Sequence, residues 1–185
     1  TEQPFKMAVD DNVRFSVKIF PTLKTSSPQS LIEFGQFGLN LDPEGHVSFS
    51  FGSNIVTTDE AISIRSWYRV EAQINKTGLM SIELINLNNS KNSKPTVIQV
   101  DLEPDLSEQA PVIIAAKRVG GSIKNCFNGK IERPEICADS QIIACWDFSE
   151  NIPSLVVSGV ECPDLTLINA PTRAVTGALW DASEM

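Results

Sequence analysis

Apolar and polar residues alternate along most of the first 150 positions of the chain. The first such stretch has apolar residues at every second position, namely Val13, Phe15, Val17 and Ile19. A period of two places these side chains on one face of a β-strand and the intervening polar residues on the other face. The pattern predicts a half-buried strand with one face in water.

Two further regions predict hairpins. Leu39 and Leu41 precede the turn sequence 42–45, and alternation resumes over 47–51. In this turn Pro43 fixes φ and Gly45 tolerates a positive φ. Alternating segments at 68–74 and 80–84 flank a second turn at 75–78.

The remaining apolar segments also have the lengths of strands. We expect strands at 97–102, 112–116 and 142–148, a buried strand at 112–116, and an exposed polar loop at 86–94. No window of about 11 residues shows a helical period. Many short strands with regularly spaced turns predict an all-β fold, an antiparallel jelly-roll sandwich.

The alternation fades after residue 150, where Pro153, Pro163 and Pro171 interrupt the chain. We therefore predict two regions. Residues 1–150 form the β-sandwich, and residues 151–185 form an extended tail or a linker toward a C-terminal domain.

The net charge of the chain limits the classes of partner that we expect. The 185 residues have a net charge of -8 and 42% hydrophobic residues, which is ordinary for one globular domain. An acidic surface repels phosphate backbones and anionic lipids, so we expect neither nucleic acid nor a membrane as partner. No apolar run approaches the roughly 20 residues of a membrane span.

The four cysteines, Cys126, Cys137, Cys145 and Cys162, form no C-x-x-C pair, and the chain has one histidine. We expect no metal site and no cofactor in this chain. Reduced, buried thiols are one interpretation, and it fits a cytoplasmic protein. The alternative is a Cys126–Cys137 disulfide in an extracellular protein.

The sequence contains no convincing catalytic constellation. His46 follows the turn at 42–45 and is expected on a surface loop, and there is no G-x-S-x-G motif. Glu132 and Glu135 lack the spacing of glycosidase carboxylates on a strand, and Pro134 interrupts the ladder between them. The prediction is that this chain alone is not an enzyme and has no catalytic residue.

Aromatic residues supply the candidate for ligand binding. Tyr68 and Trp146 share the parity of their apolar neighbours, which predicts core positions. Trp67 has the opposite parity and is the candidate platform for a glycan. The acidic segment 10–12 is interpreted as a solvated loop, because it lacks the spacing of a calcium loop.

Three phrases resemble laminin-G-like, concanavalin-A-like jelly rolls. Phe127-Asn128-Gly129-Lys130-Ile131, followed by Pro134-Glu135-Ile136, resembles the closing strands of that fold. Residues 15–22 resemble its opening strand, and 66–70 its tryptophan strand. The resemblance spans roughly residues 5–148 and implies the same sandwich. In it Gly129 would permit a tight bend, and Phe127, Ile131 and Ile136 would anchor the core.

The later sequence resembles the large subunit of N,N-dimethylformamidase and its relatives. The phrases that carry this resemblance are 144–149, Asn169-Ala170-Pro171-Thr172-Arg173-Ala174-Val175-Thr176-Gly177 and Trp180-Asp181. In that family a laminin-G-like module precedes an α/β region that hydrolyses small amides at a metal-dependent centre. The chain departs from the family pattern at Ala178-Leu179, where His-Asn is expected.

This resemblance implies a noncatalytic module with a structural or docking role in an amidohydrolase. Its partners would be the following catalytic domain of the same polypeptide and other subunits. Thr172, Arg173 and Trp180 would dock that domain, Arg173 by a forked salt bridge and Trp180 as an apolar anchor. A lectin-like module that binds a glycan and an extracellular adhesion domain remain the alternatives.

Overall fold

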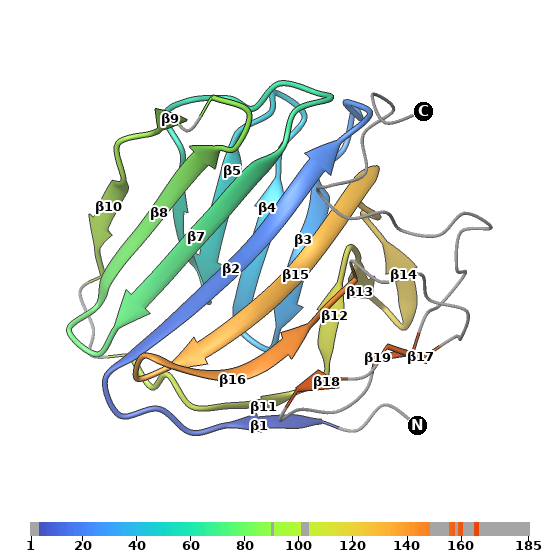
Figure 1. Ribbon diagram of the computed structural model, residues 1–185. Coiled ribbons are helices and arrows are strands. Elements are labelled where there is room, and N and C mark those ends of the chain that lie inside the picture. Colours follow the sequence, from blue (N-terminus) through green and yellow to red (C-terminus); the bar gives the residue numbers. More distant parts are fainter. Residues whose placement is uncertain are drawn as a thin grey trace.

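The computed structural model describes residues 4–89, 91–100 and 104–148, together with 156–157, 159–160 and 165–166. Two β-sheets lie face to face (Figure 1). Within the described residues there is no helix, and every strand pair is antiparallel. The predicted all-β sandwich is confirmed.

The larger sheet lies in front in Figure 1, with long strands that run diagonally across the view. In spatial order its strands are β10 (Thr96–Gln99), β8 (Leu79–Asn86), β7 (Tyr68–Asn75), β2 (Asn12–Pro21), β15 (Gly129–Ala138), β16 (Gln141–Trp146) and β18 (Gly159–Val160), and β9 (Lys91–Asn92) pairs with β8.

The smaller sheet lies behind it and is covered by it. In order, its strands are β12 (Val112–Ile114), β3 (Gln29–Phe34), β4 (Phe37–Leu41), β5 (Val47–Phe51) and β6 (Asn54–Thr57). Three short pairs complete the described strands: β1 (Phe5–Met7) with β11 (Glu108–Ala110), β13 (Lys117–Val119) with β14 (Ser122–Lys124), and β17 (Val156–Val157) with β19 (Leu165–Thr166).

Aromatic side chains hold the two sheets together. Phe15 of β2 packs against Phe37 and Phe49 of the smaller sheet, with ring centroids 5.3 Å and 5.7 Å away. Phe37 also contacts Phe34 and Phe51. Aromatic contacts of this kind add about 0.5–1.5 kcal/mol each beyond the apolar area that they bury. The alternating residues of β2 predicted to face inward are all buried here.

The observed strands refine the sequence expectations. The turn predicted at 42–45 joins β4 to β5, and the Asp42 side chain accepts hydrogen bonds from the amides of Gly45 and His46. Tyr68 and Trp146 are in the core, as predicted from their parity. The segment at 112–116 is different: β12 is only half-buried, because it lies at the edge of the smaller sheet.

Strand β15 accommodates Pro134 by an irregularity. Its register against β2 shifts between Glu132 and Glu135, and Arg133 there has a φ of 46°. A bulge lets the strand continue where proline cannot donate to the ladder. Gly129 does not make the tight bend that the sequence suggested. It begins β15, where an added Cβ would lie 2.4 Å from the Phe20 carbonyl oxygen, so the glycine allows close strand approach.

The predicted tail at 151–185 lies mostly outside the described residues. Only the short strands β17, β18 and β19 are described there. The docking residues Thr172, Arg173 and Trp180, and Cys162, lie outside the described residues. Their roles remain predictions from the sequence.

Candidate functional site

The face of the larger sheet that points away from the smaller sheet is polar, and we call it the outer face. Because the inward positions of β2 are buried, Arg14, Ser16 and Lys18 point outward. The register places Gln73 of β7 and Cys137 of β15 beside Arg14. The next row along the strands contains Glu71, Ser16 and Glu135.

Ion pairs link the charged side chains of the outer face. Glu71 lies between two arginines, 3.9 Å from Arg14 Nη1 and 3.4 Å from Arg69 Nε. On the other side of β2, Arg133 Nε lies 2.7 Å from Glu135 Oε1. Lys18 and Glu132 pair at 3.6 Å. Each of the carboxylates in these pairs therefore has a cationic neighbour.

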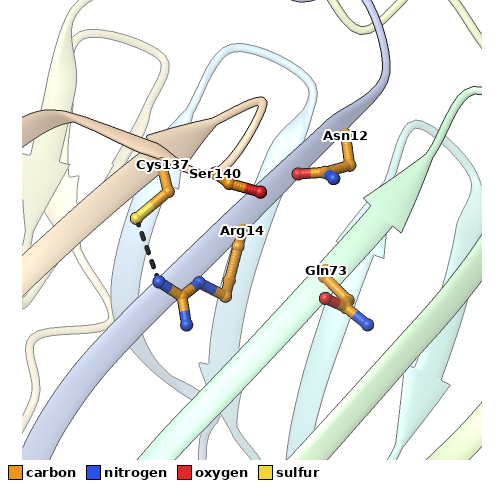
Figure 2. A pocket seen from close by; sticks show the side chains of 5 residues that line it. All are labelled: Asn12, Arg14, Gln73, Cys137 and Ser140. Carbon is orange, nitrogen blue, oxygen red and sulfur yellow. Dashed lines mark hydrogen bonds between the residues drawn. The ribbon is translucent and has the colours of Figure 1, made fainter.

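A pocket opens at the end of the outer face where β2 begins. Its cavity of about 290 Å³ is lined by Asn12, Arg14, Gln73, Cys137 and Ser140, and we call it the Arg14 pocket. Figure 2 shows that β2, β7 and the β15–β16 hairpin contribute these side chains, with Arg14 between Cys137 and Gln73. Arg14 Nη2 donates to Cys137 Sγ at 3.4 Å.

The turn between β15 and β16 shapes the rim of this pocket. Ala138 pairs with Gln141, so Asp139 and Ser140 form a two-residue turn with φ values of 50° and 70°. Two positive φ values match the twist of hairpin strands, and aspartate tolerates that conformation. Asp139 then reaches the segment before β2, where its carboxylate accepts hydrogen bonds from the amides of Asp10, Asp11 and Asn12 at 2.7–3.0 Å.

The charge states in and beside the pocket follow from these contacts. The backbone amides of Asp10, Asn12 and Asp11 hold the pKa of Asp139 below its ordinary value, because they stabilise the carboxylate form. The hydrogen bond to Cys137 raises the pKa of Arg14 above its ordinary value. The pocket thus presents a permanent cation, and the Arg14 side chain is 40% exposed.

The other end of the outer face is aromatic and closed. Trp67 packs against Phe20 with ring centroids 5.4 Å apart, and Lys130 Nζ lies 5.5 Å from the centre of the Phe20 ring. The backbone of Trp67 is held by the Asn88 side chain at 2.8 Å. Trp67 is only 7% exposed, so the prediction that it offers an open platform to a sugar is wrong. Its parity pointed outward, but its ring packs against the Phe20 ring of β2.

The described cysteines are free thiols. Cys126 precedes β15 and Cys137 lies near its other end, so the ten-residue strand separates them. At about 3.3 Å per strand residue they are much farther apart than the roughly 4.4–6.8 Å between Cα atoms that a disulfide needs. The structure therefore does not allow the Cys126–Cys137 bridge. Burial raises the pKa of the Cys145 thiol, which keeps it neutral and poorly nucleophilic near pH 7.

The single histidine, His46, does not line the Arg14 pocket. His46 is half-buried, and its Nδ1 lies 2.9 Å from the Thr58 carbonyl oxygen. It is more enclosed than the expected surface-loop residue, because the β4–β5 turn folds against the segment after β6. Among the described residues, no three histidine, cysteine or acidic side chains gather as a metal site. No helix in the described part of the chain is long and apolar enough to cross a membrane.

Comparisons with known proteins relate the chain to other β-sandwiches. No family model matches the sequence, and no curated protein matches it. The structure is similar to a candidate carbohydrate-binding protein from Bacteroides ovatus, with a TM-score of 0.60 and 12% identity over 92% of this chain and 61% of that one. It is also similar to the CBM40 of the Ruminococcus gnavus IT-sialidase bound to α2,3-sialyllactose, with a TM-score of 0.56 and 14% identity over 74% of this chain and 85% of that one.

The chain is an all-β jelly-roll sandwich. At these identities the likeness shows a shared fold only, and two of the similar structures are described as a carbohydrate-binding module and a carbohydrate-binding protein. None of these findings supports a relationship with dimethylformamidase.

Sequence reasoning missed all five residues of the Arg14 pocket. Asn12 was interpreted as part of a solvated loop, and Arg14 only as the wet side of a strand. The available signal was their parity, since Arg14 and Gln73 occupy outward positions of predicted strands. Parity does not reveal which outward residues become neighbours, because that depends on the register between β2, β7 and β15.

Proposed function

We propose that this β-sandwich is a noncatalytic, lectin-like module that binds a carbohydrate on the outer face of its larger sheet, at the Arg14 pocket. The observation that carries the proposal is the composition of this pocket. Two amides, a hydroxyl and a guanidinium converge on one cavity, and sugars are bound by such convergent hydrogen-bonding groups. The fold likeness to carbohydrate-binding modules supports the same function.

The chemistry of the outer face favours binding over catalysis. Its carboxylates Glu71, Glu132 and Glu135 each form an ion pair with a lysine or arginine side chain, whereas a glycosidase needs carboxyl groups that flank the scissile bond and react with it. The neutral Cys145 thiol and the engaged His46 ring also fit a binding module.

A glycan array tests this proposal directly. The purified chain, labelled at lysines, is applied to immobilised neutral and acidic glycans, and positive spots are confirmed by isothermal titration calorimetry. We expect saturable binding to at least one glycan class, and chemical shift changes at Asn12, Gln73 and Ser140 in the complex. Absence of saturable binding to every class, with the fold intact by circular dichroism, would overturn the proposal.

A second role rests on the phrase Asn169–Gly177. Its resemblance to the dimethylformamidase large subunit favours a module that shields, orients or oligomerises an amide-hydrolysing domain. That phrase lies outside the described residues, and the comparisons add nothing to it. Under this proposal the purified chain does not turn over formamide, and the parent reading frame encodes an α/β domain beyond Met185. Formamide turnover by the chain alone, or a parent without such a domain, would contradict this role.

A further inference from the structure

We infer that the sugar held in the Arg14 pocket carries a carboxylate, as sialic and uronic acids do, and that Arg14 binds this group. The inference rests on the proposed function and specifies its ligand class. It follows from the charge of the pocket, the free hydrogen-bonding capacity of Arg14 and the neutral groups around it.

The charge of the pocket is positive although the chain is acidic. Among the described residues that line the pocket, Arg14 alone is charged. Glu71 offsets it only in part, because Glu71 also faces Arg69, so these three side chains retain one net positive charge. Glu135 is paired with Arg133 at the much shorter distance of 2.7 Å.

Two acidic side chains at the rim, those of Asp139 and Asp11, are also engaged. The Asp139 carboxylate accepts three backbone hydrogen bonds. Asp11 lies 3.2 Å from Lys76 Nζ. These contacts reduce the repulsion that either carboxylate would exert on an anion beside Arg14.

The guanidinium of Arg14 is available to a ligand. It has five N–H donors, and its contacts are a thiol at 3.4 Å and a carboxylate at 3.9 Å. A thiol is a weak acceptor, and 3.9 Å is too long for a hydrogen bond. A ligand carboxylate can accept two parallel N–H bonds from a guanidinium, which is the strong and directional arrangement for this pair of groups.

The neutral lining suits the remainder of one sugar ring. The amides of Asn12 and Gln73 and the Ser140 hydroxyl can each donate to and accept from ring hydroxyls. A cavity of about 290 Å³ lies at the lower end of ligand pockets, so it fits a single residue of a glycan. A net charge of -8 and a single cation disfavour densely charged polyanions.

The test measures binding of matched ligands by isothermal titration calorimetry. The probes are the methyl glycosides of N-acetylneuraminic acid and glucuronic acid, the methyl esters of both, and methyl glucoside. We expect at least one free acid to bind, and its ester to bind at least about tenfold more weakly, because a charge-assisted pair is lost. The two acids separate a sialoside ligand from a uronoside ligand.

Variants of the protein test whether Arg14 causes the difference in affinity between the free acid and its ester. Arg14→Met should weaken binding of the free acid at least about tenfold and leave the ester unchanged, whereas R14K should give an intermediate loss. Lys6→Met removes an equal charge at an exposed position of β1 and should bind as the natural protein does. If Arg14→Met does not fold, chemical shift mapping on the natural protein replaces it: acid and ester should differ in their shifts at Asn12, Gln73 and Ser140.

Equal affinity for acid and ester, or an Arg14→Met protein that binds the acid normally, would overturn the inference. If the array shows binding only to neutral glycans, the lectin-like function stands and the acidic ligand is wrong. If no glycan binds at all, the proposed function itself is wrong.

Discussion

The two ends of the outer face are built from the same strands but are filled in opposite ways. At one end the Phe20 ring packs against Trp67 and lies below the Lys130 ammonium, and Trp67 is almost fully covered. At the other end Arg14 and Gln73 stand apart over a cavity, with exposed polar atoms. An aromatic group that is already packed contributes to stability, whereas a spaced set of polar groups retains capacity for a ligand. The position of a tryptophan on an outward face is thus poor evidence for a sugar platform.

The largest expected effect comes from Trp67→Ala at the closed end. Loss of a buried aromatic side chain should cost about 3 kcal/mol of unfolding free energy, measured by urea denaturation. Glycan affinity measured under native conditions should not change. Trp67→Phe is the matched control and should lose less, because part of the contact with Phe20 remains. Lost affinity at unchanged stability would show instead that Trp67 touches the ligand.

A smaller and pH-dependent effect is expected for Asp139→Asn at the open end. Folding lowers the pKa of Asp139, because the carboxylate form accepts the three amide hydrogen bonds. This carboxylate therefore stabilises the fold fully above the pKa of the unfolded chain, near 3.8, and the stabilisation is lost as the pH falls through the lower pKa of the folded state. The variant should be less stable than the natural protein at pH 7, and the difference should shrink in strong acid. Thermal unfolding at pH 7 and pH 3 measures this.

The exposed Asp59→Asn is the control for Asp139 and should show no such convergence with pH. A constant difference between Asp139→Asn and the natural protein at all pH values would contradict the clamp formed by the carboxylate and the backbone amides.

The smallest expected effect is that of Gln73→Ala in the Arg14 pocket. Glycan affinity should fall a few-fold, because one neutral hydrogen-bonding group is lost, while stability should change by no more than about 0.5 kcal/mol. Gln109→Ala, on exposed β11, is the matched control and should change neither quantity. Calorimetry measures the glycan affinity of both variants, and urea denaturation measures their stability. Unchanged affinity in Gln73→Ala would remove this residue from the site.

Local sequence patterns predicted the sandwich because buried and solvent-facing positions alternate along each strand. The alternation in β2 identified its inward face, and parity placed Tyr68 and Trp146 in the core. The same patterns did not predict the Arg14 pocket. Its residues come from β2, β7 and the β15–β16 hairpin, and only strand register brings them together. The turn at Asp139 and Ser140 also lacks the glycine that usually marks a two-residue hairpin.

The hydrogen bond that the Asp10 amide donates to the Asp139 carboxylate joins residues 129 positions apart. Contacts of such long sequence separation require most of the chain to be in place before they form. The rim of the Arg14 pocket can therefore arise only after β15 and β16 have docked beside β2, late in the maturation of the domain. A nascent or clipped chain that lacks this hairpin would hold a sheet without the Arg14 pocket, so the pocket is complete only when the whole domain has folded.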